Sequence, residues 1–158
     1  MSATPGAQVI ERFYAAFDAR DGDAMAACYA PGARFGDPVF PELRDGEIGD
    51  MWRMLVGTPG SDLRIELREH DASGDAGTAR WIAHYTFSRT GRPVVNDVRA
   101  TFRFSDGLIA EHKDAFGFHR WARQALGPAG LLLGWTPVVQ AKVRAQAARS
   151  LQEFRGTP

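Results

Sequence analysis

The stretch TARWIAHYTFSRTGRPVVNDVRATFRFSDGLIAEHKDAFGF, residues 78–118, decides the fold of this chain. Apolar and polar side chains alternate along it, and the alternation is interrupted at Thr90-Gly91 and at Ser105-Asp106-Gly107. A period of two predicts strands, and short breaks that contain glycine predict hairpins between them. With a further strand ahead of Ser73-Gly74-Asp75, we expect a meander of four antiparallel strands over residues 63–70, 78–88, 93–104 and 108–118.

The part of the chain before this meander is mainly helical. Apolar residues recur at helical spacing over residues 7–19 and 48–55, with a short helix through residues 25–28 between them. Pro31-Gly32 is expected to stop the short helix, and a short strand over residues 33–37 ends at Pro38. Helices grouped before an antiparallel sheet predict an α+β domain whose sheet curls over three N-terminal helices.

After Phe118 the composition changes, and we expect a C-terminal helical extension over residues 119–155 behind a core of residues 7–118. Pro137 suits the first turn of its final helix. The apolar stripe of that helix contains Val139, Val143, Ala147, Leu151 and Phe154. Such a stripe fits docking on the chain's own domain, a dimer contact or a lid over a pocket. The length of 158 residues predicts a single domain, 1–158.

Composition restricts the class of partner. Lysine plus arginine and aspartate plus glutamate both total 19, so no net charge attracts nucleic acid or an anionic membrane. Cys28 is the only cysteine, which excludes an internal disulfide and fits a reducing compartment. The N-terminus has no signal-peptide pattern, and the longest apolar run, residues 131–133, is far too short for a membrane span. We expect a cytoplasmic protein that binds a small hydrophobic molecule.

His112 and Asp114 are two residues apart near the end of the last predicted strand and therefore share one face. Whether that face is buried depends on the strand's register. The alternative inward set contains Glu111 and Lys113, whose long charged side chains are easily solvated. We therefore place His112 and Asp114 inward, where polar groups must be hydrogen-bonded or used for chemistry.

Aromatic side chains of the same inner face would surround this pair as an apolar cup. The expected cup contains Phe13, Phe17, Trp52, Trp81, Tyr85, Phe102 and Phe116, with Asp37 and Asn96 as further polar members. An apolar pocket with a few convergent polar groups is the usual pattern of a ligand site. A carboxylate there can act as a general base on a carbon acid, assisted by the imidazole. Alternatively, the pair satisfies itself and only ties the strand to a helix. We expect no metal, because a third ligand is missing, and no cofactor.

The order of helices, Gly36-Asp37-Pro38, the meander and Glu111-His112-Lys113-Asp114 resembles the nuclear transport factor 2-like superfamily, especially its SnoaL-like cyclases and ketosteroid isomerase-related proteins. The resemblance implies a cone-shaped fold around a pocket and a homodimer formed through the convex sheet face at Ile82, His84 and Thr86. SnoaL-like cyclases have a general-base aspartate in a similar stretch, which implies Asp114 as the base with His112 beside it. Ketosteroid isomerase instead uses the aspartate of an Asp-Pro pair, which matches Asp37.

The oxyanion donors of ketosteroid isomerase are not matched. The donor tyrosine's position holds Phe13, with Tyr14 one residue further and counted among the pocket residues, and the donor acid's position holds Ala100. The sequence therefore predicts an isomerase- or cyclase-type enzyme without a cofactor that acts on a small hydrophobic carbonyl compound. The alternative is a non-catalytic ligand-binding or dimeric interaction domain of the same fold.

Overall fold

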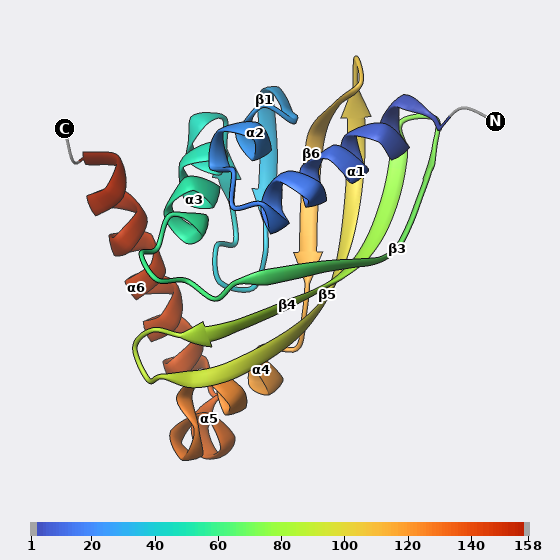
Figure 1. Cartoon of the computed structure of the whole chain (residues 1–158). Coiled ribbons are helices and arrows are strands. Elements are labelled where there is room, and N and C mark those ends of the chain that lie inside the picture. Colours follow the sequence, from blue (N-terminus) through green and yellow to red (C-terminus); the bar gives the residue numbers. More distant parts are fainter. Residues whose placement is uncertain (1–2, 157–158) are drawn as a thin grey trace.

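The computed structural model describes residues 3–156, in which a curved six-stranded sheet packs against helices (Figure 1). The helices are α1 (Pro5–Asp18), α2 (Gly22–Ala26), α3 (Gly46–Val56), α4 (Phe118–Leu126), α5 (Pro128–Leu133) and α6 (Pro137–Gly156). The strands are β1 (Tyr29–Gly36), β2 (Leu43–Arg44), β3 (Arg64–Ser73), β4 (Ala76–Phe87), β5 (Arg92–Ser105) and β6 (Leu108–Ala115). The predicted α+β class is confirmed, but the sheet is mixed rather than purely antiparallel.

The first helices begin where local side chains satisfy their free amide groups. The Thr4 side chain accepts a hydrogen bond from the Ala7 amide, and Pro5 occupies the first turn of α1, where a missing amide hydrogen is tolerated. Asp21 caps α2 through the Ala24 amide. The helices α1 and α3 then bury their apolar faces in the main core, which lies on the concave side of the sheet.

The meander β3–β6 pairs in antiparallel order, as the glycine turns predict. Trp81 is opposite Val98, and Phe102 is opposite His112, so these side chains share the concave face. Inward-facing residues of β4 and β5 are buried, while Arg99 and Arg103 point outward and are exposed. The register of β6 buries His112 and Asp114, which are 1% and 6% exposed.

Three details of the sheet differ from the sequence prediction. β1 starts at Tyr29 instead of residue 33, because a register shift between Tyr29 and Arg34 absorbs Pro31-Gly32 without ending the strand. β1 pairs in parallel with β6, and the short strand β2 adds to its other edge. β6 ends at Ala115 instead of residue 118, because α4 begins there after Gly117.

The C-terminal extension folds back onto the domain. Gly127 separates α4 from α5 with φ of 70°, a conformation that favours glycine. Residues 131–133 form the end of α5, and Leu132 and the nearby Trp135 are exposed. Figure 1 shows α6 beside α3, where Arg155 Nε lies 3.0 Å from Asp50 Oδ2. Within residues 3–156 we find no helix both long and apolar enough to cross a bilayer.

Candidate functional site

A chain of side-chain hydrogen bonds runs from α3 through β1 to β6. Trp52 Nε1 donates to Tyr29 Oη at 2.9 Å, and Tyr29 Oη lies 2.7 Å from His112 Nδ1. His112 Nε2 lies 2.8 Å from Asp114 Oδ1. The parallel pairing of β1 with β6 is what brings Tyr29 beside His112. The sequence pair His112-x-Asp114 is thus the end of a four-residue network.

The hydrogen bonds of this network suit one tautomer of the imidazole. Indole Nε1 can only donate, so the Tyr29 hydroxyl accepts from Trp52, and its own hydrogen is available to His112 Nδ1. Burial raises the pKa of Tyr29 well above its usual value, which keeps that hydrogen in place. A neutral imidazole that accepts at Nδ1 carries its hydrogen on Nε2 and donates it to Asp114 Oδ1. Each hydrogen bond is therefore directed toward the carboxylate.

Aromatic rings enclose His112 on several sides. The centroid of its ring lies 4.5 Å from that of Phe102, 5.0 Å from that of Phe35 and 5.7 Å from that of Phe13. Because the ring is so enclosed, it lies behind Asp114 and not on the cavity surface. His112 is placed to orient Asp114 and does not itself line the cavity.

In front of Asp114 lies a cavity of about 1190 Å³. Six of the expected pocket residues line it: Phe17, Trp52, Trp81, Tyr85, Asn96 and Phe116. Phe13, Tyr14 and Phe102 were expected there but belong to the packed core behind that wall. Asp37 and Asp114 both line the cavity, and the rest of its wall is largely apolar. This composition is typical of small-molecule sites.

Asp37 lies in the turn that follows β1. Its Oδ1 accepts hydrogen bonds from the amides of Val39 at 2.7 Å and Phe40 at 2.6 Å, the local turn expected of an Asp-Pro pair. Burial raises the pKa of Asp37 to about 6, and the neighbouring charge of Asp114 adds to the rise against those two hydrogen bonds. Asp37 is thus the carboxyl group of the cavity that gains a proton in mildly acidic solution.

Two buried donors near Asp114 have no acceptor. Tyr14 Oη and Trp81 Nε1 form no hydrogen bond of good geometry with any described residue. Their ring centroids are 5.7 Å apart, and the Trp81 indole is close enough to Tyr14 Oη to oppose the rise in its pKa. Burial, followed by the charge of Asp114, raises the pKa of Tyr14 well above its usual value. Unsatisfied buried donors are costly to a folded protein, so a pair of them in one place is unusual. Trp81 also lines the cavity.

Sequence reasoning missed Tyr29 and the loop before β3, and it left the contribution of α6 open among three placements. Tyr29 lies two residues before Pro31-Gly32, a pair that is locally typical of a helix stop, so its place in a strand was not predicted. Residues 58–63 supply one rim of the cavity, and α6 closes another side with Val139, Val143 and Ala147. Of the placements considered for the last helix, its apolar stripe faces the cavity of its own domain.

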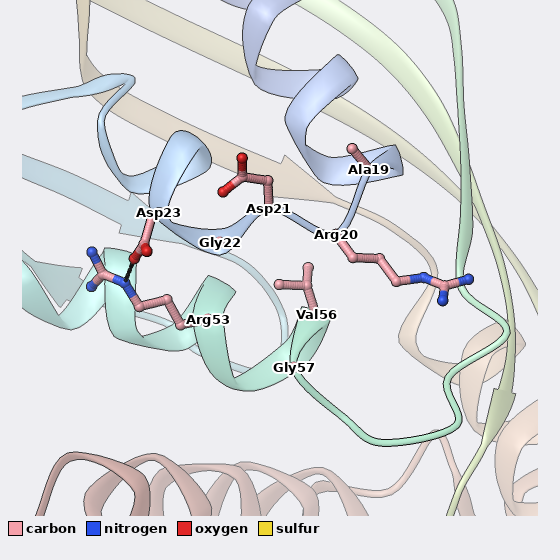
Figure 2. Close-up of a pocket in the computed structure, with 8 residues that line it drawn as sticks. All are labelled: Ala19, Arg20, Asp21, Gly22, Asp23, Arg53, Val56 and Gly57. Atoms are coloured by element: carbon pink, nitrogen blue, oxygen red, sulfur yellow. Dashed lines mark hydrogen bonds and ion pairs between the residues drawn. The ribbon is translucent and has the colours of Figure 1, made fainter.

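A second, more open cleft lies between α1, α2 and α3 (Figure 2). Its charged groups are already used in the fold: Arg53 Nε is 2.7 Å from Asp23 Oδ1, and Arg20 reaches away to the Leu63 carbonyl oxygen. Asp21 caps α2. This cleft offers no free polar group for a ligand. Within residues 3–156 no three histidine, cysteine or acidic side chains gather at a spacing that suits a metal ion.

Comparisons with known proteins identify the family and the fold. A family model described as a SnoaL-like domain matches residues 10–112, which leaves Asp114 and α4–α6 outside the matched region. An NTF2-like protein of unknown function from Burkholderia pseudomallei is 19% identical with a TM-score of 0.66, over 77% of this chain and 98% of that one. A Catenulispora acidiphila protein with a ketosteroid isomerase-like fold, solved with trimethylamine, is 15% identical with a TM-score of 0.68, over 82% and 98%.

An LEH-like epoxide hydrolase from M. tuberculosis is 19% identical with a TM-score of 0.64, over 85% of this chain and 95% of that one. Identities this low establish a shared fold and leave the reaction open. The predicted NTF2-like fold is confirmed. No curated protein matches the chain significantly.

Proposed function

The chain belongs to the SnoaL-like domain family, and we propose that it is a cofactor-independent enzyme that uses Asp114 as a general base on a small hydrophobic carbonyl compound. One observation carries this proposal. Oδ1 of Asp114 is held by His112, while no described residue donates to Oδ2, and the carboxylate lines a largely apolar cavity. A fixed carboxylate with one free oxygen in such a cavity is suited to remove a proton from carbon.

The proposed step is an enolisation. Oδ2 of Asp114 takes a proton from a carbon next to the carbonyl group. The electron pair of that C–H bond forms the C=C bond of the enolate, and the π pair of the C=O bond moves to the carbonyl oxygen. Asp37, when protonated, gives its proton to that oxygen, so that Asp114 gains one proton and Asp37 loses one. When Asp114 returns its proton to another carbon of the conjugated enol and Asp37 takes back the proton of the enol oxygen, the result is an isomerisation with both carboxyl groups restored.

The relay gives Asp114 its fixed orientation. His112 donates to one oxygen and is itself held by Tyr29, so the carboxylate cannot rotate without breaking a buried network. Holding a base in one orientation supplies part of the rate enhancement, because the reacting atoms then meet without further ordering. His112, Tyr29 and Trp52 act in this scheme as positioning residues.

The test begins with a thermal-shift screen of steroids, terpenoids and polyketide fragments that carry a ketone. For compounds that stabilise the protein, exchange of the hydrogens next to the carbonyl group is followed by NMR in D₂O. We expect Asp114→Asn to slow this exchange by about 10² to 10⁴-fold. Asp62→Asn is the matched control, since Asp62 also lines the cavity but both of its oxygens are held by Thr86. Exchange at the same rate in Asp114→Asn would refute the role of the base.

The second candidate is a non-catalytic binding or dimeric interaction domain. It is favoured by the internal satisfaction of the relay, in which His112 has partners at both nitrogens. This function predicts that Asp114→Asn and His112→Ala each lower the stability of the fold and are coupled in a double-mutant cycle. It also predicts that the protein catalyses no exchange of a ligand's hydrogens with D₂O. If the two substitutions are coupled and the wild type also exchanges the hydrogens of a bound ligand with D₂O, the enzyme is supported instead.

A further inference from the structure

Two cationic side chains of helix α6 border the cavity. The apolar residues Val143 and Ala147 of this helix face the cavity and are half-buried. Lys142 and Arg149 also line it, but they are exposed to water. They therefore lie where the apolar face of the helix meets its solvated face, at the edge of the cavity. This places cations where a ligand enters.

The position of α6 is fixed after Lys142 by side chains that reach other elements. Arg144 Nε donates to the Pro38 carbonyl oxygen at 2.9 Å, next to the turn that holds Asp37. Further along, Leu151 is buried and Arg155 pairs with Asp50 on α3. Figure 1 shows the helix extending from the end of α5 to the side of α3. Lys142, two residues before Arg144, is therefore held near the cavity by the fold.

The cavity has opposite charges at its two ends. Lys142 is exposed and lines the cavity, so it lies at the mouth, where Arg89 of the turn after β4 also contributes. Asp114 is almost completely buried and forms the floor with Asp37. The acid at the mouth, Asp62, is already held by Thr86. Among residues 3–156 no acidic side chain forms an ion pair with Lys142.

We propose that the ligand of this cavity carries a carboxylate or a similar anionic group at the end opposite its reacting carbon, and that Lys142 binds this group. This inference rests on the proposed function, because it assumes a small apolar ligand in the cavity. The two carboxylates of the floor repel an anionic group, and Lys142 with Arg89 attracts it. The ligand is thus oriented with its anion at the mouth and its neutral carbonyl end at Asp114.

Two fluorescent probes with nearly the same body test this orientation. 8-Anilinonaphthalene-1-sulfonate is an anion, and N-phenyl-1-naphthylamine is its neutral counterpart without the sulfonate. Lys142→Met removes the proposed contact, and Lys113→Met removes the only other lysine of the chain, which is exposed on the outer face of β6. We expect Lys142→Met to weaken binding of the anionic probe about three- to tenfold at low salt, with no change for the neutral probe. Lys113→Met should leave both dissociation constants unchanged.

An Ala147→Trp variant separates cavity binding from binding to the exposed leucines of α5, because Ala147 lines the cavity and a larger side chain fills it. This variant should bind both probes more weakly than the wild type does. Unchanged binding of the anionic probe to Lys142→Met, beside normal binding of the neutral probe, overturns this inference and leaves the proposed function intact. Failure of both probes to bind, or binding insensitive to Ala147→Trp, overturns the proposed small-molecule function as well.

Discussion

Replacing Asp37 with asparagine should stabilise the protein above pH 6. The amide oxygen of asparagine can still accept the hydrogen bonds of the Val39 and Phe40 amides, so the turn is preserved while the charge is removed. The carboxyl group of Asp37 has a pKa of about 6 in the folded protein against 3.8 as its reference value. Because one pH unit corresponds to about 1.4 kcal/mol, the buried charge costs the fold about 3 kcal/mol above pH 6.

The sign of the pH dependence follows from proton binding. Between pH 4 and pH 6 the folded state holds the Asp37 proton and the unfolded state has lost it, so the stability of the wild type falls as pH rises through this window. Below about pH 4 both states are protonated and the two proteins should be equally stable. The gain from Asp37→Asn should therefore appear between pH 4 and pH 6 and be constant at higher pH.

Urea unfolding followed by circular dichroism at several pH values between 4 and 8 measures this difference directly. Asp62→Asn is again the control, because hydrogen bonds from Thr86 lower the pKa of Asp62 and its charge stabilises the fold. That variant should be less stable than the wild type at pH 7 and should approach it as pH falls. Should Asp37→Asn be no more stable than the wild type at pH 8, the burial cost assigned to Asp37 would be wrong.

Three further measurements test other parts of the structure. Tyr29→Phe leaves the donor and the acceptor on either side of its hydroxyl unpaired, so urea unfolding should show a loss of about 1–3 kcal/mol. In Gly130→Ala the new methyl group meets the Ala122 carbonyl oxygen, and differential scanning fluorimetry should show a lower melting temperature; Gly156→Ala has open space and should melt like the wild type. Light scattering should give the mass of a homodimer, and the mass of a monomer would contradict the expected association through the convex face.

The local features of this fold could be predicted, and those that join distant segments could not. Glycine turns and alternation identified the meander and its inner face, because neighbouring strands are joined by short turns. The parallel pair β1–β6 joins segments some eighty residues apart, and no short turn in the sequence connects them. Tyr29 was missed for this reason, although His112 and Asp114 were assigned to the correct face.

The place of α6 was also beyond local reasoning. Its apolar stripe contains small residues and its charges are spread around the helix, so the pattern fits several partners equally well. Arg144 and Arg155 determine the docking through contacts with the Pro38 carbonyl oxygen and with Asp50. Such contacts depend on the fold being formed and leave no periodicity in the sequence.

Features that reduce stability are concentrated around Asp114, and this distribution favours a ligand over a purely structural role. Asp37 is a buried acid without a cation partner, and Tyr14 and Trp81 keep buried donors without acceptors among the described residues. A relay that only tied β6 to α3 would need none of these groups, since Tyr29 and His112 already satisfy each other. Costly polar groups persist where function uses them, because selection otherwise replaces them with stabilising residues. At such a site, Asp37→Asn should stabilise the fold and also abolish the exchange of hydrogens next to the carbonyl group of the ligand.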